Sequence, residues 1–179
     1  MEPGALLASG GLLVDTSAEL GAPLPGPAAP ASRPPHVRPA RPEDLAALLE
    51  IAAGFTANRF HRDPRLPRER AAAVHARWIT AASRGEHGRA LVAVDEGQVA
   101  GFATLSPPDD ALGVAVTGLV AVHPAHRGRR LLERLVAACA AESPAAEPWR
   151  ALYTSTQVSN VAALRAFTGP GRGCSRHPS

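Results

Sequence analysis

Hydrophobic and polar residues follow helical spacing in some segments of this chain and strand spacing in others. Helical spacing predicts helices over residues 42–53, 68–83 and 130–142, and a shorter one over 160–167. Pro42 followed by two carboxylates is typical of a helix start, and Gly54 is typical of a helix end. These helices are short enough for an ordinary globular domain.

Short apolar runs bounded by glycine, proline or charged residues predict strands. The runs lie at 37–41, 90–94, 98–105, 112–122 and 149–156. The residues Asp95-Glu-Gly97 separate two of them by a tight turn, which predicts a hairpin. Taken together, the order β-α-α-β-β-β-α-β-α indicates an α/β fold.

Outside residues 37–167 the alternation of helices and strands is not found. Residues 12–20 fit a single strand without a partner nearby, so residues 1–20 are interpreted as a remnant strand of an N-terminal region. Residues 21–35 are rich in proline, alanine and glycine and predict an extended linker. We therefore expect the compact domain over 36–167 and an irregular tail over 168–179.

The segment 119–135 is the most informative part of the chain. An apolar run ends at Val122, Pro124 follows, and a basic turn containing Gly128 leads at once into an amphipathic helix. The first N–H groups of a helix have no partner within the helix and lie at the positive end of its dipole. The junction therefore suits an anion, whose identity this pattern leaves open.

Composition narrows the classes of function. The net charge is +3 and arginine supplies every positive side chain, but no long basic face with interleaved aromatic residues indicates nucleic-acid binding. No apolar run approaches the ~20 residues that span a bilayer, and no secretory leader is evident, so we expect a cytoplasmic protein without membrane contact. Cys139 and Cys174 have no partner at metal-ligand spacing, so no metal is expected.

Two segments at a suitable separation resemble motifs of the GNAT N-acetyltransferases. The cofactor loop of that family reads Arg/Gln-x-x-Gly-x-Gly/Ala, and it aligns here with Arg127-Gly-Arg-Arg-Leu-Leu132. The run Asn160-Val-Ala-Ala-Leu-Arg-Ala-Phe167 resembles the family's Asn-x-x-Ala-x-x-x-Tyr helix. The resemblance covers about 37–167 and implies a mixed, mostly antiparallel twisted sheet flanked by helices.

The resemblance also implies acetyl-CoA as co-substrate and a small-molecule amine as acceptor, joined by direct attack of the amine on the thioester. In the family, loop N–H groups bind the pyrophosphate, and the pantetheine arm lies along the preceding strand, where one N–H polarises the thioester carbonyl. The cofactor-binding residues implied in this way are Leu119, Val120, Ala121, Val122, Arg127, Gly128, Arg129, Arg130, Leu131, Leu132 and Asn160. A simple helix cap is the alternative for Asn160.

Within the family, three segments resemble the TDP-fucosamine acetyltransferases, which acetylate the 4-amino group of a nucleotide-linked deoxysugar. They are Phe55 to Pro64, Trp78-Ile79 and Thr156 to Leu164. This closer resemblance implies an amino sugar nucleotide as acceptor. It places Arg59, His61 and Asp63 on the acceptor side, and solvated loop charges are the alternative.

Three positions depart from the family pattern. Arg130 replaces a glycine, Leu132 replaces glycine or alanine, and Phe167 replaces the tyrosine that protonates the leaving thiolate. No catalytic side chain is therefore assigned. One hypothesis is an active N-acetyltransferase in which water or another residue supplies the proton. The other is a catalytically weak or inactive GNAT-like module that binds acyl-CoA.

The chain also lacks the aromatic strand that follows this helix in the family. Its absence predicts a bare sheet edge beside the last strand, at 149–156. Because a bare edge offers unpaired backbone groups, it favours pairing of two copies into a homodimer.

Overall fold

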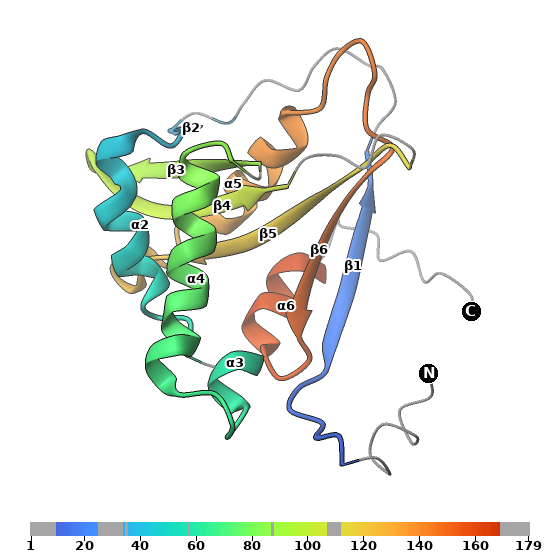
Figure 1. Cartoon of the computed structure of the whole chain (residues 1–179). Helices are drawn as coiled ribbons and strands as arrows, with labels where there is room; N and C mark the ends of the chain where they lie inside the picture. The colour runs from blue at the N-terminus through green and yellow to red at the C-terminus, as the bar shows by residue number, and fades with distance from the viewer. Residues whose placement is uncertain are drawn as a thin grey trace.

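The computed structural model describes residues 10–24, 34, 36–56, 58–86, 88–106 and 112–168. Most of the predicted linker, nearly all of the predicted tail and Cys174 lie outside these residues. A six-stranded sheet in the order β1-β6-β5-β4-β3-β2 forms the centre (Figure 1). Its strands are β1 Ser17–Pro23, β2 Val37–Pro39, β3 Arg89–Asp95, β4 Gln98–Leu105, β5 Val114–Val122 and β6 Ala151–Gln157.

All neighbouring strands in the sheet are antiparallel except β5 and β6, which are parallel. The predicted mixed, mostly antiparallel sheet is therefore confirmed. The parallel pair requires a crossover connection, and helix α5 supplies it.

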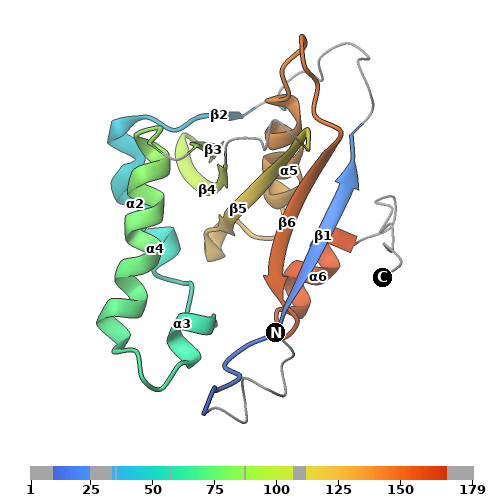
Figure 2. The same cartoon turned by 45° about the vertical axis from the view of Figure 1, so that its right-hand side comes forward.

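Helices cover both faces of the sheet. They are α2 Leu45–Ala52, α3 Arg59–Arg62, α4 Arg68–Ser83, α5 Leu131–Ala141 and α6 Val161–Thr168, with 3₁₀ turns η1 Pro42–Asp44 and η2 Pro124–His126. Helices α2 and α4 lie on one face and α5 lies on the other (Figures 1 and 2). The four predicted helices are confirmed, whereas α3 falls in a segment predicted to be a loop.

Strand β3 shows why its sequence is apolar without alternation. Leu91 and Ala93 pack in the cluster that contains Leu135 of α5, whereas Val92 packs in the cluster that contains Ile79 of α4. Both faces of the strand are therefore buried, which favours a continuous apolar run. A fully buried leucine or isoleucine contributes about 2 kcal/mol to folding.

The N-terminal strand changes two expectations. It covers Ser17–Pro23 rather than 12–20, so it extends into the predicted linker. Strand β1 pairs antiparallel with β6 over its whole length, from Ser17 opposite Gln157 to Pro23 opposite Ala151. The prediction of a bare edge beside this strand is therefore wrong. It failed because the partner comes from more than a hundred residues earlier in the chain. The strand at this edge of the sheet is β1 rather than β6.

The described residues also bear on membrane insertion and metal binding. None of their helices is both long and apolar enough to cross a membrane. No group of three or more His, Cys, Asp or Glu side chains within these residues could hold a metal ion. Burial raises the pKa of the Cys139 thiol to about 12, so this side chain packs as an apolar group at neutral pH.

A partly buried ion pair connects β2 to the turn η1. Asp44 accepts hydrogen bonds from the Arg38 guanidinium at 2.7 and 2.9 Å and from the Arg41 N–H at 2.7 Å. The hydrogen bond from Arg38 is the main cause that holds the pKa of Asp44 below its ordinary value of 3.8.

We expect Asp44→Asn to lower the free energy of unfolding at pH 7 by about 2 kcal/mol, because hydrogen bonds to a charged group are lost. The contribution of a carboxyl with a lowered pKa is present above its unfolded pKa and is lost as the pH falls through its folded pKa. Urea unfolding at pH 7 and at pH 3 checks both expectations. If the free energies of unfolding of variant and parent differ by the same amount at the two pH values, the ion-pair explanation is contradicted.

Candidate functional site

Strands β5 and β6 separate in the middle of the sheet (Figure 1). They pair only from Val114 opposite Ala151 to Thr117 opposite Thr154. The rest of β5, residues 118–122, is exposed or only partly buried although the strand is central. The separation therefore leaves a gap with open backbone groups along β5.

A bulge between β4 and β5 accompanies the separation. The register shifts between Ala103 and Leu105, and the Leu119 N–H donates to the Thr104 hydroxyl at 2.8 Å. Gly118 is required there, because a Cβ would lie 2.8 Å from Thr104 Oγ1. Such bulges bend a strand and redirect its groups, and here the bend falls where β5 leaves β6.

Backbone alternation decides which groups of β5 point into the gap. The His123 N–H donates to the Ala100 carbonyl at 2.8 Å, so Gly101 and Val122 form a non-hydrogen-bonded pair. Ala121 therefore points its N–H and carbonyl toward β4, while Val120 and Val122 point theirs toward the gap. The four strand residues predicted to contact pantetheine thus divide into two toward β4 and two toward the gap.

The loop after β5 ends at an open helix N-terminus. Gly128 and Arg130 adopt left-handed backbone conformations, with φ of 79° and 58°. Arg130 is the N-cap of α5, and no side chain of the described residues caps the helix. The first N–H groups of α5 are therefore available to a ligand. The side chains of Arg127, Arg129 and Arg130 are exposed around them.

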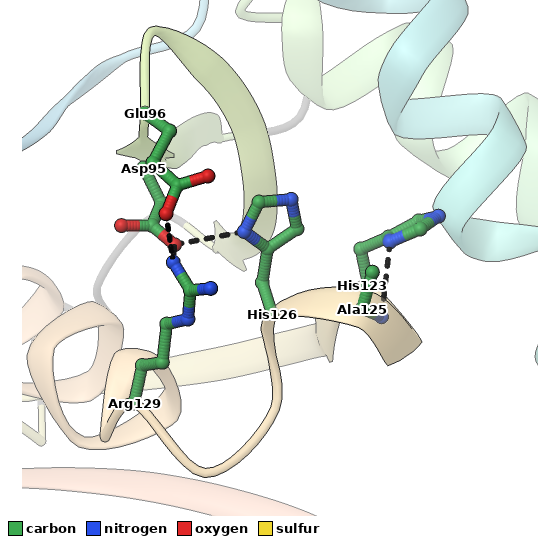
Figure 3. Close-up of polar contacts among 6 residues, drawn as sticks. All are labelled: Asp95, Glu96, His123, Ala125, His126 and Arg129. Atoms are coloured by element: carbon green, nitrogen blue, oxygen red, sulfur yellow. Dashed lines mark hydrogen bonds and ion pairs between the residues drawn. The ribbon is translucent and has the colours of Figure 1, made fainter.

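Asp95, at the end of β3, contacts this loop (Figure 3). Its carboxylate lies 2.8 Å from His126 Nδ1 and 2.5 Å from Arg129 Nη1, and Glu96 lies 2.8 Å from the same Arg129 nitrogen. The hydrogen bond from His126, with Arg129 nearby, lowers the pKa of Asp95. The sequence does not reveal this contact, because 31 residues separate Asp95 from His126 and no local pattern links them.

The predicted acceptor-side residues gather at α3. Asn58 caps this short helix by accepting from the N–H groups of Phe60 and His61. The Arg59 guanidinium lies 4.9 Å from the Phe60 ring centroid. Asp63 instead binds Arg65 through two oxygens at 3.0 Å, which lowers the pKa of its carboxyl. Arg59 and His61 therefore have no carboxylate partner among the described residues, whereas the carboxylate of Asp63 is already paired with Arg65.

Helix α3 lies at the open side of the gap in both views (Figures 1 and 2). Arg62 joins it to the turn after β6, where its Nη2 donates to Ser159 Oγ at 2.8 Å. The same guanidinium pairs with Asp15 of the N-terminal segment at 3.0 Å. Arg62 was not a predicted site residue, and no local motif marks it.

Aromatic rings extend from α3 to α4. The Phe60 ring meets the rings of His75 and Trp78 at centroid distances of 5.7 and 5.5 Å. The His61 ring lies parallel to His75 at 6.4 Å. Trp78 is 45% exposed, so this cluster presents an aromatic surface between α3 and α4.

The last two predicted residues lie on α6. Asn160 caps this helix, since its Oδ1 accepts from the Ala163 N–H at 3.2 Å. Phe167 lines a cavity of about 60 Å³ together with Thr117, Val136 and Leu152. Because Thr117 is the last residue of β5 that pairs with β6, Phe167 lies at the point where the two strands begin to separate.

Comparison with known proteins identifies this architecture. Residues 47–169 match the acetyltransferase (GNAT) family. The chain belongs to this family. Members of the GNAT family use acetyl-CoA as co-substrate.

One curated relative is a protein of spore coat polysaccharide biosynthesis. The spore coat polysaccharide biosynthesis protein SpsD of Bacillus subtilis (strain 168) is 31% identical over 134 residues, covering 74% of this chain and 45% of that protein. The chain thus spans less than half the length of this relative.

Solved GNAT structures share the fold. The putative acetyltransferase yncA from Salmonella typhimurium, solved with its cofactor acetyl-CoA, is 25% identical with a TM-score of 0.52 and coverage of 75% of this chain and 77% of that one. A putative GNAT acetyltransferase from Novosphingobium aromaticivorans DSM 12444 is 18% identical with a TM-score of 0.54, covering 90% and 61% respectively. The second likeness concerns the fold alone.

Arg130 is strained where GNAT proteins usually have glycine. A left-handed backbone costs a residue with a Cβ roughly 1–2 kcal/mol, and glycine avoids this cost. The Arg130 side chain pairs with Glu133 in the first turn of α5 at 2.5 Å, and both Arg130→Gly and Arg130→Ala remove this pair.

We therefore expect Arg130→Gly to be more stable than Arg130→Ala by about 1 kcal/mol. Urea unfolding of the two variants side by side measures the difference, from which the shared loss of the ion pair cancels. Equal stability would show that the left-handed conformation is not held at this position in solution.

Proposed function

We propose that this chain transfers the acetyl group of acetyl-CoA to a primary amine of an amino sugar attached to a nucleotide. One observation carries the cofactor half of the proposal. The gap between β5 and β6 leads directly to the uncapped N-terminus of α5. One junction could therefore bind both the extended pantetheine arm and the anionic pyrophosphate.

The chain's own groups fit acetyl-CoA along this junction. The N–H groups of residues 128–132, with Arg127 nearby, would bind the pyrophosphate. Val122 and Val120 would pair with the pantetheine arm through the backbone groups that face the gap. The Val120 N–H would donate to the thioester carbonyl and stabilise the negative charge that develops on it. When bound, acetyl-CoA supplies the activated acetyl group.

Charge on the acceptor side favours an amine that also carries phosphate. Arg62 and Arg65 of this region pair with carboxylates, whereas Arg59 is exposed and has no carboxylate partner among the described residues. A bare ammonium would be repelled by this side, and an amine linked to phosphate would be attracted. The aromatic surface at Phe60 and Trp78 suits stacking of a sugar or base ring.

The relative from spore coat polysaccharide biosynthesis supports a sugar acceptor. The resemblance of the α3 region to the TDP-fucosamine acetyltransferases supports a nucleotide-linked one. Neither specifies the sugar, so the proposal is limited to this chemical class.

A free-thiol assay tests the proposal with acetyl-CoA and two matched acceptors. One acceptor is a nucleotide-linked 4-amino sugar and the other is the same amino sugar without the nucleotide. We expect kcat/KM for the first to exceed that for the second by at least about tenfold, since a charge-assisted contact is worth 1.5–3 kcal/mol.

Arg59→Gln should remove most of this preference. Arg84→Gln provides the matched control, because Arg84 is an exposed arginine that pairs with Glu86 at the far end of α4. Absence of thiol release with any amine would overturn the proposed activity. Equal kcat/KM for the two acceptors would overturn only the nucleotide-linked class.

A second candidate function rests on Phe167, Arg130 and Leu132. With a phenyl ring at the proton-donor position and bulky residues in the cofactor loop, the chain would bind acyl-CoA with little turnover. Calorimetric titration with acetyl-CoA distinguishes the two. Binding at micromolar concentrations without thiol release would favour the binding module over the enzyme.

A further inference from the structure

The turn between β3 and β4 is a tight two-residue turn that reaches the cofactor loop. Asp95 pairs with Gln98, and the two residues between them, Glu96 and Gly97, have φ of 51° and 80°. Positive φ at both central positions defines the turn type that matches the twist of paired strands. The carboxylate of Asp95 is therefore held at the end of a rigid hairpin rather than on a long loop.

This carboxylate holds the cofactor loop on both sides of Gly128. It contacts His126 Nδ1 before the glycine and Arg129 Nη1 after it (Figure 3). The contact is sheltered, since the His126 side chain is 13% exposed and that of Asp95 is 24% exposed. Because a carboxylate only accepts hydrogen bonds, His126 Nδ1 is the donor in this contact.

Between these two contacts the loop has little other support. A Cβ built on Gly128 would meet nothing within 4 Å among the described residues, so the space on that side of the glycine is open. The η2 turn before it is closed by its own hydrogen bonds, including Ala125 N–H to His123 Nδ1 at 3.3 Å. His126 and Arg129 therefore tie the loop to the hairpin. Asp95 contacts both of these side chains, whereas Glu96 contacts Arg129 alone.

We propose that Asp95 is a positioning residue for cofactor binding, which keeps the N–H groups of residues 128–132 directed at the phosphates of CoA. The inference rests on the proposed cofactor site. It also assigns Arg129 a structural part, because two carboxylates already neutralise its charge. The phosphates would then meet backbone N–H groups and the unpaired charge of Arg127.

Simple electrostatics predicts the opposite effect of removing Asp95, which makes the inference testable. A carboxylate near an anionic cofactor repels it, so loss of the charge alone would tighten binding. Loss of a positioning contact would weaken it, because the cofactor must then order the loop. Asp95→Ala and Glu96→Ala remove the same charge from the same turn, but only the first removes the contact with His126.

Calorimetric titration of the full chain with CoA separates these cases without an acceptor. We expect Asp95→Ala to weaken CoA binding by about tenfold, equivalent to about 1.4 kcal/mol, and Glu96→Ala to remain within about twofold of the parent. His126→Ala keeps the contact between Asp95 and Arg129. Its affinity for CoA should therefore lie between those of Asp95→Ala and Glu96→Ala. Glu86→Gln removes a carboxylate paired with an arginine at another turn and should leave binding unchanged.

Steady-state rates add a readout that general destabilisation would not give. Asp95→Ala should raise KM for acetyl-CoA and leave kcat and KM for the amine unchanged. Faster amide hydrogen exchange confined to residues 123–131 should accompany the change. If Asp95→Ala fails to fold, His126→Ala carries the same test with a smaller expected loss.

The outcomes are distinct. Unchanged or tighter CoA binding by folded Asp95→Ala would overturn the positioning role while the cofactor site stands. Equal weakening by Asp95→Ala and Glu96→Ala would also overturn it, since the His126 contact would then have no part. Absence of CoA binding by the unmodified chain would overturn the proposed site and this inference together.

Discussion

Val120→Pro is expected to lower kcat by about a hundredfold or more, because proline removes the N–H that we propose as donor to the thioester oxygen. Loss of one such donor costs enzymes about 10²–10³ in kcat. Proline is ordinarily disruptive in a central strand, since it removes a hydrogen bond of the sheet. Here the N–H of Val120 points into the gap where β5 has left β6, so no hydrogen bond of the sheet is lost.

Val122→Pro is the matched control. It removes the neighbouring N–H on the same side of the same strand, with the same restriction on the backbone. Its position is closer to the cofactor loop, so we expect mainly a higher KM for acetyl-CoA. Steady-state thiol release gives kcat and KM for both variants, and thermal unfolding shows whether both remain folded. Equal losses of kcat would contradict the assignment of Val120 as the specific donor.

Phe167→Tyr is expected to raise kcat by about tenfold or more. General acids positioned at a leaving group contribute about 10²–10⁴ to rate, and a phenyl ring supplies no proton. The ring of Phe167 borders a cavity of about 60 Å³, so an added hydroxyl has room beside Thr117 at the point where the strands separate. The variant would restore the proton donor that the family pattern has and this chain lacks.

The pH dependence of kcat provides the measurement for Phe167→Tyr. A new decrease in kcat at alkaline pH, where a phenol with a pKa of about 10 loses its proton, should accompany the gain. Phe167→Leu is the control, because it changes the packing without adding a hydroxyl. An unchanged kcat in Phe167→Tyr would support the hypothesis that water protonates the leaving thiolate. An equal gain in both variants would indicate a packing effect.

The sequence by itself determined most of the helices and strands and the location of the strand–turn–helix junction. Helix α4 and strand β4 begin and end at the residues predicted from spacing and turn residues, because their burial patterns repeat within a few residues. The open helix N-terminus at Leu131 was also readable, since strand, turn and helix follow one another within one short segment. Local patterns such as these need no information from distant parts of the chain.

Only the tertiary structure decided the features that depend on distant partners. The pairing of β1 with β6, the contact of Asp95 with the cofactor loop and the link from Arg62 to Ser159 join segments that are 31 or more residues apart. The direction of the Val120 N–H depends on register with β4, which a single strand does not encode. Local spacing determines elements, whereas the choice among distant partners is made by packing and by the hydrogen bonds that packing allows.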